Sequence, residues 1–289
     1  MKKYLNLIRA KHWIKNILVF LPLFFNGSIF KLKLLSLNLL AFIIFCLSST
    51  VVYIINDIND IDNDRKHAIK KNRPLANKSI SIKSALIIAI IFFILSIIAI
   101  SYLYLNTKRI GVIIIPIIYI IINILYSKIL KQIPIIDILV LVSGFVLRVL
   151  YGGITVNISL SKYLYLMIIF GAYYLGFGKR RNEIKNNGNA SRSVLTKYNE
   201  SFLDKNMYVS YALSVVTYTM WCVDTEVTSK LGHDYLFLTI PILMTILQLY
   251  SLNIEDDSSG DPVDVILSNK LLLVGIIYLI TIVVLIYFI

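Results

Sequence analysis

Three aspartates, Asp57, Asp60 and Asp64, have the residue type and spacing of a metal-binding site. They follow a long apolar run at positions i, i+3 and i+7, so a helix that continues through them places all three on one face. Carboxylates this close repel one another unless a positive charge lies between them. Mg²⁺ prefers such oxygen ligands and is commonly bound by carboxylates together with substrate phosphates. We therefore expect Asp57, Asp60 and Asp64 to be catalytic Mg²⁺ ligands. Asp62 points to another face and serves as a control.

Basic residues follow the acids directly, and Arg65, Lys71 and Arg73 could bind phosphate oxygens. A metal ion that bridges a leaving diphosphate, with Lys or Arg nearby to neutralise the developing charge, is the combination that diphosphate chemistry needs. Asn56, directly before Asp57, is a further candidate that could orient the site. The alternative for Lys71 is an ordinary cytoplasmic charge beside a membrane helix.

The elements that must position these residues are membrane helices. The chain has 289 residues, of which 58% are hydrophobic, and its mean hydropathy is +0.78. These values exclude a soluble domain, and apolar runs of about 18 residues or more recur along the chain. We expect an all-α integral membrane protein with one membrane domain over residues 1–289 and about nine transmembrane helices. The apolar segments are 14–30, 34–56, 84–105, 110–127, 135–152, 159–178, 206–223, 235–252 and 270–289.

The distribution of positive charge predicts the orientation in the membrane. With the N-terminus inside, 22 of the 29 Lys and Arg residues lie on the cytoplasmic side, 6 lie outside and Arg148 lies within a helix. Such a bias predicts a multi-pass protein of the plasma membrane with its C-terminus outside and its active site cytoplasmic. The two long cytoplasmic loops are 57–83 and 179–205. They suggest two pseudo-repeats, approximately 1–130 and 131–289.

Other functions fit the composition less well. The net charge of +13 points to membrane lipids with anionic headgroups and not to nucleic acid. Cys46 and Cys222 lack metal-ligand spacing. A transporter would also carry intramembrane charge, but the charges here cluster at one membrane face and no pair of broken helices is obvious.

The second long loop begins with a cluster of basic residues. Lys179, Arg180 and Arg181 are followed by one carboxylate, Glu183. Further along the loop are Arg192 and Tyr198. Glu200 and Asp204 have i, i+4 spacing but lie well beyond the apolar segment, and they remain an alternative second metal motif.

The first motif resembles the first aspartate-rich motif of the UbiA superfamily of intramembrane prenyltransferases. The resemblance rests on Asn56, the three aspartates and Arg73-Pro74, together with the expected helices and two polar loops, and it covers essentially the whole chain. In that family the aspartates bind Mg²⁺ and the donor diphosphate. Prenyl-transferring members have a second aspartate-rich motif, from which the basic loop here departs.

Several separated segments are similar to the polyprenyl-phosphate (decaprenyl-phosphate) phosphoribosyltransferase branch of the superfamily. They are Lys179-Arg180-x-x-Glu183, Arg192-Ser193-x-Leu195-x-x-Tyr198, Arg9-x-x-x-Trp13-x-Lys15-Asn16, Tyr126-Ser127-x-x-Leu130-Lys131-x-x-Pro134 and Ser143-Gly144-Phe145-Val146-Leu147-Arg148. The resemblance implies 5-phosphoribosyl 1-diphosphate as donor and a membrane polyprenyl phosphate as acceptor, with Mg²⁺ as cofactor and a role in cell-envelope glycolipid synthesis. The alternative is prenyl transfer from a prenyl diphosphate to an aromatic acceptor. A homo-oligomer is possible.

The resemblance also suggests roles for individual residues. Lys179, Arg180 and Arg192 are candidates for binding the donor 5-phosphate. Glu183 could bind metal, ribose or a neighbouring base, and Tyr198 could bind a phosphate or pack.

Two sites lie within apolar segments. Lys15-Asn16 is a substrate-binding candidate, with snorkelling of Lys15 to the headgroups as the alternative. Intramembrane charge is costly, so we expect Arg148 to face an anion in a polar cavity, or else to pair with an aspartate of the first motif.

Overall fold

The computed structural model describes residues 2–66, 70–187, 193–255 and 261–288. These residues form helices and loops, and no strand occurs among them. The chain divides into two compact units, Met1–Leu160 and Ser161–Ile289. The expected pseudo-repeats, approximately 1–130 and 131–289, stay a prediction.

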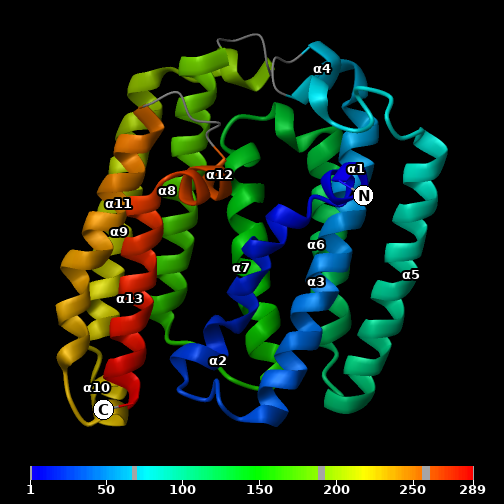
Figure 1. The fold of residues 1–289 in the computed structure, drawn as a ribbon. Helices are drawn as coiled ribbons and strands as arrows, with labels where there is room; N and C mark the ends of the chain where they lie inside the picture. Colours follow the sequence, from blue (N-terminus) through cyan, green and yellow to red (C-terminus); the bar gives the residue numbers. More distant parts are fainter. Residues whose placement is uncertain (1, 67–69, 188–192, 256–260, 289) are drawn as a thin grey trace. The chain divides into compact units, whose positions relative to one another are not determined.

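The first unit is a bundle of four long helices with short elements at their ends (Figure 1). The long helices are α3 (Leu32–Asn59), α5 (Ile82–Thr107), α6 (Gly111–Lys128) and α7 (Ile136–Val156). The short elements are α4 (Ile61–Lys66), η2 (Lys70–Asn72) and η3 (Leu130–Gln132). Helix α3 contacts α5, α6 and α7, so it is the central helix of the unit. The buried cluster around Phe45, Tyr119 and Tyr151 fills the space between these helices.

The N-terminal apolar segment is broken into short pieces and does not form one helix. These are α1 (Lys2–Leu7), the 3-10 helix η1 (Ala10–Phe20) and α2 (Leu21–Phe25). Arg9 separates the first two pieces with a left-handed backbone, φ 50° and ψ 46°. A 3-10 helix of 11 residues is far longer than the usual run of three or four, so contacts with neighbouring helices must hold it. We call residues 9–20 the N-terminal strap.

One close approach fixes the strap against α7. A Cβ atom at Gly152 would lie 1.8 Å from the carbonyl oxygen of Val19, so glycine is required there. The side-chain amide of Asn38 on α3 donates to the same carbonyl, at 3.2 Å. The strap therefore packs in van der Waals contact with the backbone of α7.

The second unit is built around an antiparallel pair, α8 (Lys162–Asn187) and α9 (Glu200–Cys222) (Figure 1). The other elements are η5 (Ser193–Lys197), α10 (Thr225–Leu231), η6 (Tyr235–Thr239), α11 (Ile240–Glu255), α12 (Pro262–Ser268) and α13 (Lys270–Phe288). Tyr174 of α8 ties this helix to α11 through hydrogen bonds with the carbonyl of Leu247 (2.5 Å) and the hydroxyl of Ser251 (2.7 Å).

Six helical segments among the described residues are long and apolar enough to cross a membrane. They are Leu32–Asn59, Ile82–Thr107, Gly111–Lys128, Ile136–Val156, Tyr235–Ile254 and Lys270–Tyr287. An all-helical membrane protein is as expected, but a count of nine transmembrane helices is not confirmed. The strap accounts for one difference. Helices α8 and α9 are long enough, but their tyrosines and charged ends lower their hydropathy.

Candidate functional site

The acidic motif lies where α3 ends. Asn56 and Asp57 belong to the last turn of α3, Asp60 follows its end, and Asp64 lies on the short helix α4. The amide of Asp60 donates to the carbonyl of Asn56 (3.0 Å), and the amide of Asp64 donates to that of Asp60 (2.8 Å). The helical hydrogen bonding thus continues in part across the break, but the three aspartates do not sit on one uninterrupted helix.

Asp57 and Asp64 meet on one guanidinium group. Nη1 of Arg73 lies 3.1 Å from Oδ1 of Asp57 and 2.7 Å from Oδ2 of Asp64. Both carboxylates are buried. Arg73 is held there because the next residues, Pro74 and Leu75, are buried and Leu75 packs into the apolar cluster beneath the loop. The spacing of seven residues therefore does bring two of the three acids to one point.

Asp60 turns toward a different cation. Its Oδ1 accepts from Nζ of Lys131, at 2.5 Å, on the short helix η3. Asn56 is bound from the same side, because Oγ of Ser127 donates to its Oδ1 at 2.9 Å. The last turn of α6 and the segment that joins it to α7 therefore lie against the acidic motif and contact two of its polar residues.

Arg9 is a third cation at the motif. Its Nη2 forms a hydrogen-bonded ion pair with Oδ1 of Asp57. Its guanidinium lies 5.0 Å from the centre of the Tyr53 ring on α3, within the range of a cation–π contact. The left-handed turn at the start of the strap directs Arg9 to this position.

Asp62, Arg65 and Lys71 lie away from this cluster. The side chain of Asp62 is 89% exposed and pairs with Arg65, at 3.2 Å. Nε of Arg65 donates to the carbonyl of Ala76, at 3.2 Å. Lys71 is exposed on η2. The control role given to Asp62 thus agrees with its position.

The surroundings of Asp64 oppose its ionisation. Burial raises the pKa of its carboxyl above the ordinary value, Arg73 acts in the opposite direction, and the neighbouring carboxylate of Asp57 raises the pKa further. A cation between the two carboxylates stabilises the charged form of both. Nη1 of Arg73 marks this point with a positive charge.

The donor set fits a divalent cation at this point. Asp57 and Asp64 present two hard oxygen ligands, and Mg²⁺ is usually bound through one or two carboxylates plus phosphate and water. No group of three or more His, Cys, Asp or Glu side chains able to hold a metal lies together among the described residues. The expected triad is therefore not assembled here, because Asp60 is directed to Lys131. Asp60 as a metal ligand stays a prediction.

Arg148 is buried within the first unit, and its hydrogen bonds run to neutral acceptors. Nε donates to Oδ1 of Asn16 (2.7 Å), Nη1 to the carbonyl of Gly144 (2.5 Å) and Nη2 to the hydroxyl of Tyr119 (3.2 Å). Its guanidinium also lies over the rings of Phe45 and Tyr119. Of the two expected environments, pairing with an aspartate of the motif does not occur among these contacts. Lys15, half-buried, lies beside Asn16 on the strap.

In the second unit, cations of the α8 end are paired with carboxylates. Lys179 lies 3.2 Å from Asp261, and the fully buried Arg180 lies 2.6 Å from Glu183. Asp261 also caps α12 by accepting from the amide of Val263, at 3.0 Å. Asp261 is therefore both the cap of α12 and the ion-pair partner of Lys179.

The remaining residues of the second loop have mixed surroundings. Arg181 pairs with Asp204 at 3.1 Å, and Glu200 is exposed. Asp204 is thus a counter-ion to a base. Tyr198 is buried and stacks on Phe202, with ring centres 5.9 Å apart. Arg192 lies outside the described residues.

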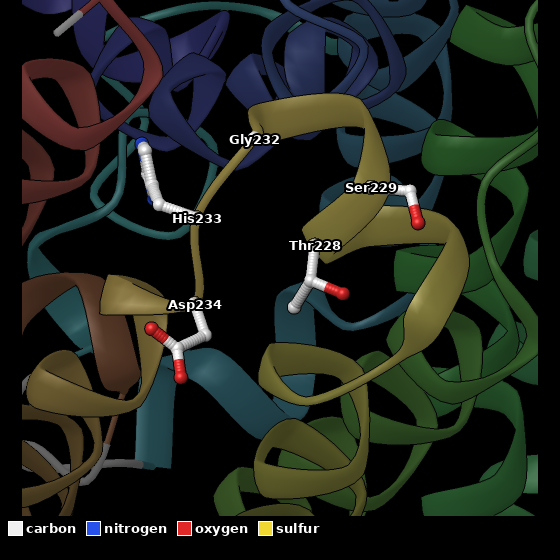
Figure 2. Close-up of a pocket in the computed structure, with 5 residues that line it drawn as sticks. All are labelled: Thr228, Ser229, Gly232, His233 and Asp234. Atoms are coloured by element: carbon white, nitrogen blue, oxygen red, sulfur yellow. The ribbon is translucent and has the colours of Figure 1, made fainter.

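A hollow occurs at the other end of the α8–α9 pair, where α10 ends. Thr228, Ser229, Gly232, His233 and Asp234 line it (Figure 2). The ring of His233 stacks on Tyr235, with centres 4.8 Å apart, and its Nε2 lies 3.1 Å from the carbonyl of Ile286. The hollow contains none of the predicted site residues.

Four contact residues were not among the predicted site residues: Arg9, Ser127, Lys131 and Asp261. Three of them belong to segments that carry the family resemblance, so a signal existed for Arg9, Ser127 and Lys131. For Asp261 the only signal was its place before Pro262, which is typical of a helix start.

Comparison with known proteins identifies the family. The sequence profile of the UbiA prenyltransferase family matches residues 18–269. The decaprenyl-phosphate phosphoribosyltransferase of Corynebacterium glutamicum is 30% identical over 271 residues, which cover 92% of this chain and 80% of that protein. The protein of the same name from Mycobacterium tuberculosis H37Rv is 28% identical over 272 residues, or 92% and 87% of the two chains.

Solved structures share the fold. A UbiA homolog from Archaeoglobus fulgidus, solved with DMAPP and Mg²⁺ bound, gives a TM-score of 0.68 at 19% identity and covers 99% of each chain. A UbiA homolog from Aeropyrum pernix gives 0.62 at 13% identity, over 92% of this chain and 97% of that one. With a family profile that spans most of its length, this membrane-embedded helical chain belongs to the UbiA prenyltransferase family of enzymes.

Proposed function

We propose that the protein transfers the 5-phosphoribosyl group from 5-phosphoribosyl 1-diphosphate to a membrane polyprenyl phosphate. The bond between ribose C1 and the diphosphate oxygen breaks, and the diphosphate leaves with the electron pair. An oxygen of the lipid phosphate forms the new bond to C1. This product would serve as a precursor of a cell-envelope glycolipid.

One observation carries the proposal. The similarity to decaprenyl-phosphate phosphoribosyltransferases extends over 92% of this chain and 80 to 87% of those proteins. The basic second loop supports the same donor, since Lys179, Arg180 and Arg181 stand where prenyl-transferring relatives are expected to have acids. Prenyl transfer to an aromatic acceptor is the alternative that an assay must exclude.

Asp57 and Asp64 would hold Mg²⁺ against the donor diphosphate, with Asp60 as a third ligand. When bound, Mg²⁺ supplies positive charge to the departing diphosphate. The structure supports Asp57 and Asp64 most directly, because both already converge on one positive nitrogen of Arg73. Asn56, held by Ser127, would orient the motif.

Cations around the acids would bind the diphosphate oxygens. Arg73, Arg9 and Lys131 each contact a carboxylate of the motif, and each could exchange this partner for a diphosphate oxygen when a metal neutralises the acids. Arg65 and Lys71 remain further candidates. These preorganised charges would stabilise the transition state as the C1–oxygen bond breaks.

In the second unit, we assign the donor 5-phosphate to Lys179, Arg180 and Arg192. Glu183 would orient Arg180, to which it is bound at 2.6 Å, and Tyr198 would contact a phosphate or support the loop. Lys15 and Asn16 are assigned to substrate binding from the sequence. A polyprenyl phosphate is already an anionic nucleophile near neutral pH, so no general base is required.

The orientation follows from the charges. The N-terminus, the acidic motif and the basic second loop would face the cytoplasm across the plasma membrane, with the C-terminus outside. This arrangement would give a water-soluble donor direct access to the site.

The deciding experiment uses purified protein in detergent with Mg²⁺, labelled 5-phosphoribosyl 1-diphosphate and polyprenyl phosphates of two chain lengths. We expect label in the lipid phase, lost on addition of EDTA and in Asp57→Asn. The product should have inverted configuration at C1, because attack from the face opposite the diphosphate is the simplest single displacement.

Two results would contradict the proposal. Transfer of label only from a prenyl diphosphate would establish the alternative activity. Retained configuration at C1 would exclude the single displacement.

A further inference from the structure

The N-terminal strap runs antiparallel to α3 with its side chains in register. Arg9 contacts Asp57 and lies over Tyr53, and the indole nitrogen of Trp13 donates to the hydroxyl of Thr50 at 3.2 Å. Farther along, the amide of Asn16 donates to Sγ of Cys46 (3.2 Å) and to the hydroxyl of Ser49 (3.4 Å). Of these α3 partners, Asp57, Tyr53, Thr50 and Cys46 recur every three or four residues along one side of the helix, and Ser49 lies beside Thr50.

The strap and the facing part of α3 have similar lengths along their axes, which explains how their side chains stay in register. A 3-10 helix rises about 14 Å from residue 9 to residue 16. An α-helix rises about 12 Å from residue 49 to residue 57. The 3-10 conformation of the strap thus lets one polar side chain reach α3 at each turn, with Arg9 at the acidic motif and Asn16 deep in the unit.

Arg148 holds the deep end of the strap. It is 5% exposed, and its Nε bonds Oδ1 of Asn16, whose amide in turn bonds α3. Its other bonds reach Gly144 on its own helix and Tyr119 on α6. One guanidinium therefore links the strap to α7 and α6, and through Asn16 to α3. A buried charge with only neutral partners among these contacts is costly. The rings of Phe45 and Tyr119 pack against this guanidinium.

We propose that Arg148, acting through Asn16, is a positioning residue that sets where the strap holds Arg9 against Asp57. This inference rests on the proposed function, because it assigns the effect of Arg148 on catalysis to Arg9. It differs from the sequence-based expectation that Arg148 itself contacts substrate. Displacement of the deep end shifts the strap along α3 and removes Arg9 from the diphosphate site.

A double-mutant cycle tests the coupling. Arg9→Met should lower kcat/KM for the donor about 100-fold and Arg148→Met about 10-fold, as for the loss of preorganised charge. If Arg148 acts through Arg9, the double variant should be within about threefold of Arg9→Met alone. Losses that multiply to about 1,000-fold would show an independent role for Arg148 and overturn the proposal.

A matched control separates positioning from general stability. Arg109 is another arginine of the first unit, and its Nη1 donates to the carbonyls of Ile154 (3.2 Å) and Thr155 (2.8 Å). Arg109→Met should lower the unfolding temperature without changing kcat/KM for the donor. If it reproduces the kinetic loss of Arg148→Met, that loss reflects general destabilisation and the proposal fails.

Trp13 provides a readout that needs no activity. The chain has two tryptophans, so Trp221→Phe leaves Trp13 as the only indole. In this background Arg148→Met and Asn16→Leu should increase acrylamide quenching of Trp13. Asn16→Asp keeps an acceptor for Arg148, so its Trp13 quenching should stay close to that of the parent. Unchanged quenching in both Arg148→Met and Asn16→Leu would overturn the proposal.

A second variant reaches the strap without removing a charge. Gly152→Ala forces a Cβ atom against the carbonyl of Val19, so it should raise Trp13 quenching and reduce donor kcat/KM in the same sense as Arg148→Met. Absence of both effects in folded Gly152→Ala would contradict a positional role for the strap. If no variant or parent transfers phosphoribose, the proposed function fails, while the quenching results still decide whether Arg148 anchors the strap.

Discussion

The aspartates of the acidic motif differ in their surroundings although the sequence spaces them regularly. Asp57 and Asp64 share Nη1 of Arg73, Asp60 binds Lys131, and Asp62 is directed to solvent. Two buried carboxylates that require a cation between them are the strongest candidates for metal binding. The exposed one has no such requirement.

These differences predict a graded series of Asn variants. Asp64→Asn should reduce kcat/KM for the donor about 100-fold or more, since it removes a charged ligand of the Mg²⁺ that would neutralise the departing diphosphate. Asp60→Asn should also cause a clear loss. Asp62→Asn should stay within about twofold, as expected for an exposed surface change. The measurement is donor kinetics at several Mg²⁺ concentrations, and equal losses for Asp62→Asn and Asp60→Asn would refute the ranking.

Lys179 and Arg180 should also behave differently. Arg180 is 0% exposed, so Arg180→Met removes the cation that faces buried Glu183 and should cost about 3–5 kcal/mol of stability. Lys179 is 22% exposed. Lys179→Met should therefore cost less than about 1 kcal/mol of stability, but it should raise KM for the donor about 10-fold. Thermal unfolding and donor kinetics check both, with the exposed Lys197→Met as control. A Lys179→Met variant with unchanged KM would remove Lys179 from the 5-phosphate site.

At the residue scale, local spacing predicted part of the site. The rest depends on contacts between residues that are far apart in the sequence. The i, i+7 relation of Asp57 and Asp64 survives because helical bonding partly continues past residue 59. The direction of the Asp60 side chain depends on its ion pair with Lys131, which is 71 residues away. Arg9 reaches Asp57 from 48 residues away through a left-handed turn that arginine rarely adopts. No local pattern encodes these pairings.

At the scale of elements, the segment between α6 and α7 carries backbone strain. Ile135 has φ 70° and ψ −45° directly before α7 begins. A β-branched residue in this region costs about 1–3 kcal/mol. The same segment carries Lys131, which binds Asp60, so the strained turn helps to fix the distance between η3 and α7.

Replacement of Ile135 by glycine should relieve this strain. After the larger conformational entropy of glycine in the unfolded chain is subtracted, Ile135→Gly should stabilise the protein by roughly 1 kcal/mol. Ile133, similarly exposed but with an extended backbone at φ −99°, provides the control, and Ile133→Gly should destabilise it. Thermal unfolding in detergent measures both, and a lower unfolding temperature for Ile135→Gly than for Ile133→Gly would argue against strain.

Hydrophobic patterning predicted the long helices well and the strap poorly. The apolar segments 34–56, 84–105, 110–127 and 135–152 lie within α3, α5, α6 and α7 apart from a residue or so at two ends. The segment 14–30 failed because hydropathy does not distinguish an α-helix from a 3-10 segment held by neighbours. Asn16 of this segment and Trp13 just before it bond α3 side chains, and this requirement appears only when α3 is in place.

At the scale of the whole molecule, charge and apolar surface define how the protein meets a membrane. Among the residues that the structure describes, six segments can cross it by length and composition, and the chain carries a net charge of +13. The bias of Lys and Arg predicts that the loop after α4 is cytoplasmic and that the connection after α10 is external.

Cysteine labelling tests this orientation. Asn77→Cys lies in the first loop and Ser229→Cys lies after α9, and both positions are exposed. A membrane-impermeant maleimide added to intact cells should label Ser229→Cys at once and Asn77→Cys only after lysis. Cys46 and Cys222 are buried, so background labelling should be low. The reverse pattern would place the acidic motif outside.

The strap has a consequence for how the protein is made. It leaves the ribosome well before α7, because Arg148, which binds Asn16, is encoded 132 residues later. At about 5–20 residues per second, roughly 7–26 s of translation separate the two. During that interval Asn16 lacks the guanidinium of Arg148, and the carbonyl of Val19 lacks Gly152, against which it packs. The strap can therefore dock fully only after α7 has been synthesised, so Arg9 is held against Asp57 later than the order of the chain alone would suggest.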